Sequence, residues 1–140
     1  MRKLLSRSAS VALAFFVLGA APTESRHVKV ALVAANGSGI GGFVNLVGMP
    51  NEKGTNITVH ATGLTPGTHY LSIYYENHVC DLESDSVPND VIAHYVGAGD
   101  GTATVHAKID DGLDEVNSIS VRLDNTDLTL QACADVHPGG

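Results

Sequence analysis

After residue 26, apolar and polar residues alternate along most of the chain, and no stretch has the sustained 3.6-residue period of a helix. Residues 55–61 show the pattern clearly, with Ile57, Val59 and Ala61 on one side of an extended chain. Clusters such as Leu64–Gly67 and Ala98–Gly101 are typical of turns. The alternation predicts strands over 28–35, 40–47, 55–61, 69–76, 91–97, 102–109, 116–123 and 128–134. We therefore expect an all-β domain, a sandwich or barrel, with residues 91–97 and 102–109 forming a hairpin.

The charge balance excludes two classes of partner. The chain has 8 Lys+Arg against 15 Asp+Glu, a formal net charge of −7. Binding to nucleic acid and docking on anionic lipid both depend on clustered Lys and Arg. We therefore expect neither nucleic acid nor an anionic membrane surface as a partner.

The first residues have the pattern of an export signal. Residues 1–10 are basic, residues 11–21 are apolar, and small residues follow. The apolar run is too short to span a bilayer as a helix. We predict a signal peptide over 1–21, an N-terminal segment over 22–27, a β-domain over 28–134 and a disordered tail over 135–140. The mature protein is then secreted or periplasmic, without a membrane span.

Two cysteines, Cys80 and Cys133, follow the signal segment. In an exported chain an even number of cysteines suggests a disulfide. They lack the Cys-x-x-Cys spacing of zinc or redox sites, so we expect them to form one structural bond.

The segment from Gly63 to Tyr74, GLTPGTHYLSIY, resembles the copper/zinc superoxide dismutases, which carry G-L-x-x-G-x-H-G-F-H-V-H at this place. Further similarities follow in the same order, at Ile40–Val44, Asp100–Val105 and Ile119–Arg122. The resemblance covers residues 28–134 and implies an eight-stranded Greek-key barrel of the superoxide dismutase type. In that family, two cysteines at these places are disulfide-linked.

The departures from the family concern its metal site. Ser72 and Tyr74 stand where the family has two outward-pointing copper histidines, and no histidine stands near Val121–Asp124, where another is expected. The loop after residue 76 is also short, and His78 is its only histidine. Copper needs several converging nitrogen ligands, and the negative net charge would repel superoxide. We therefore expect a non-catalytic relative, without a cofactor, that serves as a binding or structural module.

Two alternatives remain open. In the first, the chain is a divergent dismutase or metal-binding protein that holds copper or zinc through relocated ligands. The candidate ligands are His60, His78, His94 and His106. His94 and His106 would be neighbours in the expected hairpin, although scattered surface histidines explain the pattern more simply. The other alternative is an immunoglobulin-like module, against which the absence of Trp argues.

A contact surface is the last prediction from sequence. On the expected strand 69–76, Leu71 and Ile73 would face the core, so Tyr70, Ser72 and Tyr74 would face outward. Tyrosine gives a large contact area at low entropic cost. We expect an unknown protein or small molecule as the partner, and the family resemblance adds a homodimer. The acidic stretch 77–90 is expected to be a solvated loop.

Overall fold

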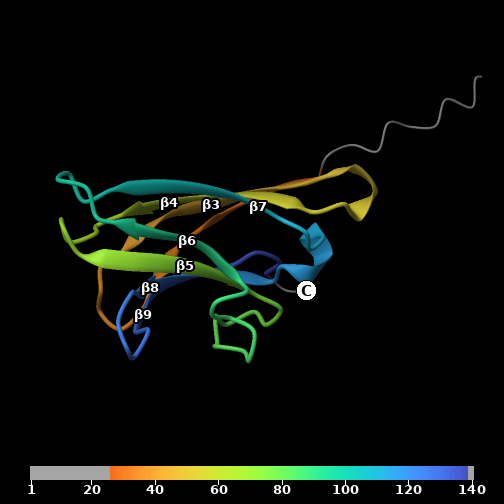
Figure 1. Ribbon diagram of the computed structural model, residues 1–140. Coiled ribbons are helices and arrows are strands. Elements are labelled where there is room, and N and C mark those ends of the chain that lie inside the picture. The colour runs from red at the N-terminus through yellow and green to blue at the C-terminus, as the bar shows by residue number, and fades with distance from the viewer. Residues whose placement is uncertain (1–25, 139–140) are drawn as a thin grey trace, which may run out of the picture.

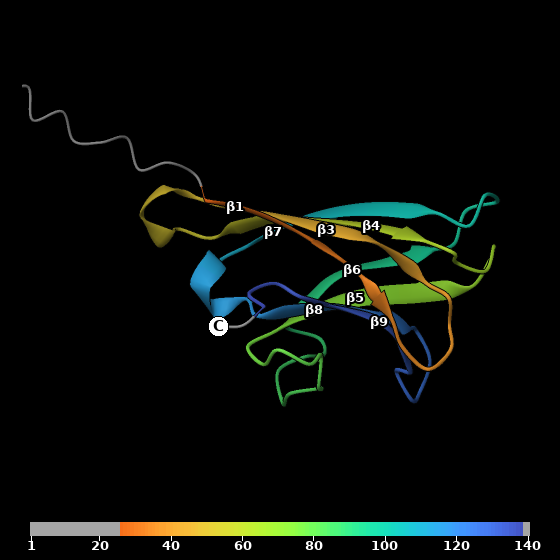
Figure 2. The same ribbon diagram turned by 180° about the vertical axis from the view of Figure 1, so that it is seen from behind.

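The computed structural model describes residues 26–138, and the predicted signal peptide lies outside the described residues. The fold is all-β: antiparallel strands form two sheets that pack face to face as a sandwich (Figures 1 and 2). The strands are β1 His27–Ala31, β2 Val33–Ala34, β3 Gly41–Gly48, β4 Thr55–Thr62, β5 His69–Tyr75, β6 Val91–Val96, β7 Ala103–Ile109, β8 Ser118–Leu123 and β9 Leu130–Asp135. The all-β prediction is confirmed.

The first expected strand, residues 28–35, is divided between the two sheets. The four-stranded sheet has the order β1-β3-β4-β7, and the five-stranded sheet has the order β2-β9-β8-β5-β6. The expected first strand is divided at the buried Leu32, because β1 pairs with β3 whereas β2 pairs with β9. The chain thus passes from one sheet to the other, which accounts for the ninth strand.

The expected hairpin between residues 91–97 and 102–109 is wrong. β6 pairs with β5 in the five-stranded sheet, and β7 pairs with β4 in the four-stranded sheet. The Gly99–Gly101 turn therefore connects two sheets rather than two paired strands. The turn itself is present, but the strand partners are set by contacts with distant segments.

The main core fills the space between the sheets. Its fully buried members come from both layers and include Val44, Leu46, Ile57, Val59, Ile119 and Val121. Close packing also explains Gly42, whose φ is +114° and where an added Cβ would lie 1.9 Å from the His60 carbonyl oxygen. Only glycine fits this approach of β3 to β4.

The predicted C-terminal tail begins too early. Asp135 ends β9, Val136 is buried in the core, and the His137 ring contacts the Leu113 carbonyl oxygen at 3.0 Å. The predicted N-terminal segment, residues 22–27, is one residue too long at its end. β1 begins at His27, which pairs with Val47. Among residues 26–138, no helix is long and apolar enough to cross a bilayer.

Candidate functional site

The predicted outward stripe on β5 is wrong in its orientation. Tyr70 is 2% exposed and Ser72 is 0% exposed, and both lie in the interior between the sheets. The Tyr70 hydroxyl accepts a hydrogen bond from the Thr65 backbone N–H, and Ser72 Oγ lies 2.7 Å from the Tyr95 hydroxyl. Tyr74 is half-buried against the same core. These three residues therefore hold β5 to its neighbours and do not form an exposed contact surface.

The other face of β5 carries Leu71, Ile73 and Tyr75, and it is buried as well. Together with Cys80 these side chains form a second apolar cluster on the outer face of the five-stranded sheet. Half-buried residues from β6, β9 and the β8–β9 loop border it: Val91, Leu128, Leu130 and Cys133. Because both faces of β5 are buried, alternation alone did not reveal which face points between the sheets.

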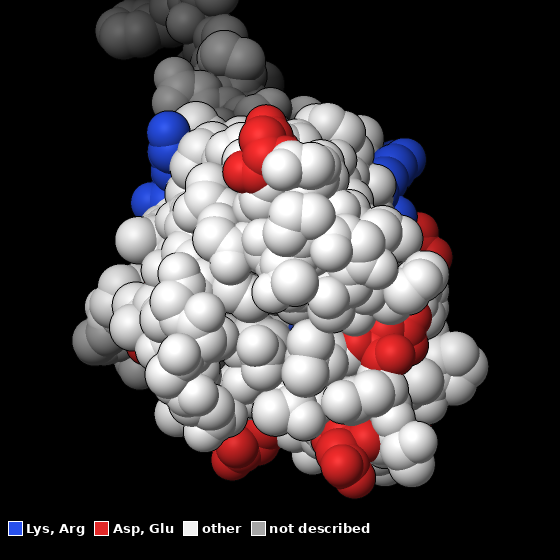
Figure 3. All heavy atoms as spheres, turned by 90° about the vertical axis from the view of Figure 1, so that its left-hand side faces the viewer, with Lys and Arg blue, Asp and Glu red and all other residues white. Residues whose placement is uncertain are grey.

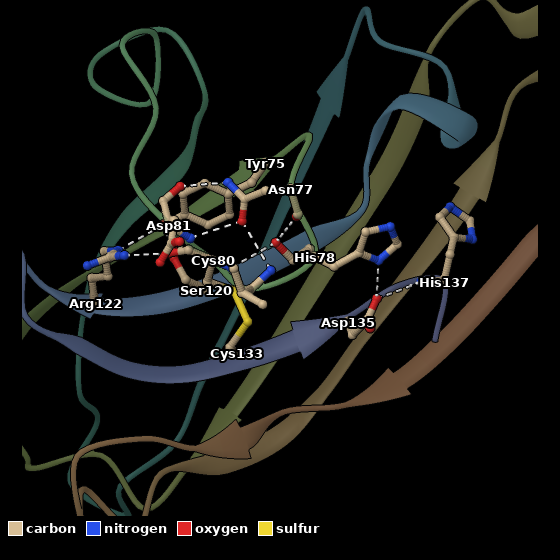
Figure 4. The surroundings of a disulfide bond; sticks show 12 residues. Tyr75, Asn77, His78, Cys80, Asp81, Ser120, Arg122, Cys133, Asp135 and His137 are labelled. Atoms are coloured by element: carbon tan, nitrogen blue, oxygen red, sulfur yellow. Dashed lines mark hydrogen bonds and ion pairs between the residues drawn. A yellow bond between two sulfur atoms is a disulfide. The ribbon is translucent and has the colours of Figure 1, made fainter. Parts of the chain in front are cut away.

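The predicted disulfide between Cys80 and Cys133 is confirmed. The sulfur atoms are 2.05 Å apart and the Cα atoms 6.0 Å apart, across a sequence separation of 53. The bond joins the long β5–β6 loop, residues 76–90, to β9 (Figure 4). Cys80 belongs to the second apolar cluster, and Cys133 packs against it.

Arg122 is the centre of the polar contacts around this bond. Its side chain comes from β8 and is 7% exposed. Nε donates to the Tyr75 hydroxyl at 2.8 Å and Nη2 donates to the Cys80 carbonyl oxygen (Figure 4). Nη1 donates to the Leu128 carbonyl oxygen. One buried guanidinium thus fastens β5, the 76–90 loop and the β8–β9 loop together. All three acceptors are uncharged.

Sequence reasoning missed the role of Arg122. The available signal was an arginine within the alternating strand 116–123, at a position whose neighbours, Val121 and Leu123, are apolar. Charged residues within half-buried strands need several hydrogen bonds to compensate their desolvation. Throughout residues 26–138, every buried side-chain nitrogen or oxygen has a hydrogen-bond partner.

The candidate metal ligands lie apart. His60 on β4 and His106 on β7 stand on the outer face of the four-stranded sheet, where their Nδ1 atoms contact the hydroxyls of Thr104 and Thr58 at 2.7 and 2.9 Å. These two are diagonal neighbours across adjacent strands. His94 belongs to β6 in the other sheet, so the expected His94–His106 pair is wrong.

His94 and His78 each pair with a single carboxylate. His94 Nδ1 lies 2.8 Å from Asp124, and His78 Nδ1 lies 2.8 Å from Asp135. In the described part of the chain, no three His, Cys, Asp or Glu side chains are grouped so that they could hold a metal ion.

A surface hollow of about 500 Å³ lies at the edge between β6 and β7. Tyr74, Asp90 and Asp111 line it. Burial and then hydrogen bonding to Asp111 raise the pKa of Tyr74, and burial raises the pKa of Asp90 against the opposing effect of its bond to Tyr74. The phenol therefore stays protonated and able to donate to these carboxylates. Lys108 and Asp110 also line this hollow.

The buried tyrosines predict a loss of stability at alkaline pH. Burial raises the pKa of Tyr95 from 10 to about 12, partly offset by the bond from Ser72. The unfolded state loses this proton near pH 10, whereas the folded state holds it to about pH 12. The free energy of unfolding is therefore unaffected by Tyr95 below pH 10 and falls as the pH rises from 10 towards 12. Between pH 9 and pH 11 the free energy of unfolding should fall in both proteins. The fall should be about 1 kcal/mol smaller in a Tyr95→Phe variant than in the wild type.

Urea unfolding at the two pH values measures this difference. Tyr74 and Tyr75, whose pKa values are also raised, remain in both proteins and provide a common background. Equal pH-dependent losses in the two proteins would contradict the assignment to Tyr95.

The sequence was also compared with known proteins. No protein-family model matches it, and no curated protein matches it significantly.

Proposed function

We propose that this chain is an exported β-sandwich domain of the copper/zinc superoxide dismutase type, and that it serves as a binding module. In this proposal the surface that carries the metal in that family has become a structural face, held by a disulfide. Support comes from the strand order, the cysteine pair and the residues on the outer face of the five-stranded sheet.

The strand connections favour a Greek-key barrel. β4 and β5 follow one another in the chain but lie in different sheets, where β4 pairs with β7 and β5 pairs with β8. Such long connections between antiparallel strands are characteristic of Greek-key folds. The Cys80–Cys133 bond also joins the regions that the resemblance to the family indicates.

The observation that carries the proposal is Arg122. The resemblance places copper ligands on outward positions of the strands that correspond to β5 and β8. On β5 the resemblance assigns them to Ser72 and Tyr74, which face the interior between the sheets. The outward positions of β5 hold Leu71 and Ile73 instead, and the buried guanidinium of Arg122 bonds to Tyr75 on that outward face. Hydrocarbon supplies no ligand, and a permanent positive charge opposes a second cation at this place. These residues do not fit a copper ion.

The surface charge agrees with a role other than dismutation. A superoxide-binding site benefits from local positive charge that attracts the anion. On the end of the sandwich seen in Figure 3, Asp and Glu atoms stand out across the face, while Lys and Arg atoms lie at its upper margins. Export is supported by the basic and apolar start of the sequence and by the disulfide.

The test is metal retention together with dismutase activity. The mature chain, residues 22–140, is refolded with excess Cu²⁺ and Zn²⁺, desalted and assayed beside an authentic copper/zinc dismutase. We expect a folded, oxidised protein that retains well below one equivalent of copper and is inactive, because Leu71, Ile73 and Arg122 occupy the relevant face.

One equivalent of retained copper with catalysis would overturn the proposal and establish the divergent dismutase instead. Substitution of His60, His78, His94 and His106 would then locate the ligands. Retained metal without turnover would indicate a metal-binding protein.

A further inference from the structure

The 76–90 loop exposes an unusual set of side chains. It projects from the outer face of the five-stranded sheet and is visible in both ribbon views as the green segment (Figures 1 and 2). Val79, Leu82 and Val87 are 60%, 46% and 44% exposed, and they are three of the five large exposed apolar residues in the described chain. Single exposed apolar residues are common on proteins, so it is the concentration of three of them on one projecting loop that points to an interaction site.

The first half of this loop is held by Asn77. Its side-chain oxygen accepts hydrogen bonds from the backbone N–H groups of Val79 and Asp81, and its amide nitrogen donates to the Asp81 carbonyl and to Glu83 (Figure 4). One asparagine side chain therefore organises five consecutive residues.

The second half is held by Glu83 and Ser86. The Glu83 carboxylate accepts the Glu76 backbone N–H, and Ser86 Oγ accepts the Glu83 N–H at 2.8 Å. Ser86 is buried, and the Asp90 carbonyl accepts the Tyr74 N–H at 3.1 Å, so the far end is joined to β5.

Cys80 fastens the middle of the loop to the sheet in three ways. Its sulfur is bonded to Cys133, its carbonyl accepts from Arg122, and its N–H donates to Ser118 Oγ. The polar groups of the loop are thus turned inward to hold its shape, while apolar side chains point into solvent. A loop held in one shape binds without the entropic cost of ordering it.

The charge of the loop restricts what it can bind. Residues 76–90 contain five acidic residues and no Lys or Arg. Asp81 and Asp85 are exposed, and neither side chain makes a hydrogen bond or an ion pair with another described residue. A partner must therefore combine an apolar recess with positive charge, which nucleic acids and anionic membranes do not offer.

We infer that the 76–90 loop is a preorganised docking element for a protein whose surface has an apolar recess bordered by Lys and Arg. Val79, Leu82 and Val87 fill the recess, and Asp81 and Asp85 pair with its basic border. Buried apolar anchors supply most of the affinity in such interfaces, and the charged border increases specificity and association rate. The inference rests on the proposed binding role and names the surface that performs it.

A phage-displayed library of random short peptides is the probe. Peptides are selected on the immobilised, oxidised mature protein, synthesised, and measured by calorimetry. We expect enrichment of peptides that combine Lys or Arg with large apolar residues. A Val79→Ser/Leu82→Ser/Val87→Ser variant should bind them about tenfold or more weakly, and an Asp81→Lys/Asp85→Lys variant should bind them more weakly and with less dependence on salt.

Matched controls are available in the same chain. Val33→Ser/Val96→Ser removes the other two large exposed apolar residues, and Asp127→Lys reverses an exposed charge outside the loop. These controls should bind like the wild type. Peptides that bind the loop variants and the wild type equally would overturn the inference, as would a failure to enrich any peptide.

Self-association through the loop would also overturn it. Sedimentation velocity of the wild type and the triple serine variant tests this outcome, because a dimer that dissociates in the variant would make a second copy the occupant. If no selected peptide depends on the loop, and the protein is inactive and poor in metal in the dismutase assay, the docking loop is rejected. The proposed function then stays in place. An active, copper-loaded protein rejects the proposed function itself.

Discussion

Replacing Arg122 with methionine should lower the free energy of unfolding by about 2–4 kcal/mol. Methionine fills much of the same volume but donates no hydrogen bond. The carbonyl oxygens of Cys80 and Leu128 then lose this donor, and the Tyr75 hydroxyl keeps only its bond to Ser120. Each buried polar group left without a partner costs about 1–3 kcal/mol, and relief of the desolvated charge offsets part of the sum. Urea unfolding of the oxidised protein at pH 7 measures the change.

Arg26 provides the matched control. It forms an ion pair with Asp114 in which the two side chains are 58% and 60% exposed. Exposed pairs of this kind contribute about 0–1 kcal/mol, so Arg26→Met should change stability little. If the two methionine variants were equally stable, the view of Arg122 as the central clamp of the outer face would be wrong.

Much of the fold could be predicted from local sequence patterns. Alternation identified every strand of the main sheets within a few residues, as with β4, predicted over 55–61 and observed over Thr55–Thr62. The turn expected at Leu64–Gly67 is also present, and Gly67 has the φ of +79° that the second central position of a type II turn requires. These features depend on contacts within a few residues, which is why the sequence pattern contains them.

Strand pairing was harder to predict, because it depends on distant residues. The Ala98–Gly101 turn has the composition of a hairpin turn, yet β6 and β7 belong to different sheets. Their partners, β5 and β4, are earlier strands whose local patterns carry no information about pairing. Likewise Leu32 is one apolar residue in a continuous strand pattern, although the chain changes sheets at this residue.

The candidate site was misjudged for a related reason. Alternation on β5 predicts one buried and one exposed face, but Cys80 of the 76–90 loop, with its disulfide, packs on the second face. Ser72 was therefore placed outside although it is buried beside Tyr95. The acidic loop over 77–90 is largely exposed, as its composition predicts, but composition gave no sign of the hydrogen bonds that hold its shape. Composition does not show whether polar groups point inward or outward.

Removing the disulfide should have the largest effect on stability. A Cys80→Ala/Cys133→Ala variant loses a crosslink that spans a sequence separation of 53. The chain-entropy relation for a loop of this size gives about 4 kcal/mol of lost stability. Urea unfolding of the variant beside the oxidised wild type measures it, and the wild type should show two free thiols only after reduction. The reduced wild type should match the variant, which provides the control.

The disulfide and Arg122 hold the same residue, so their contributions should be coupled. In the wild type, Arg122 donates to a Cys80 carbonyl that the crosslink keeps in place. Without the crosslink the loop moves more freely, water reaches that carbonyl, and Arg122→Met costs less. A double-mutant cycle should therefore give a coupling energy of about 1 kcal/mol. Additive effects would mean that the guanidinium and the disulfide stabilise the outer face independently. If loss of the disulfide lowered the free energy of unfolding by less than about 1 kcal/mol, the loop would be held by its own hydrogen bonds alone.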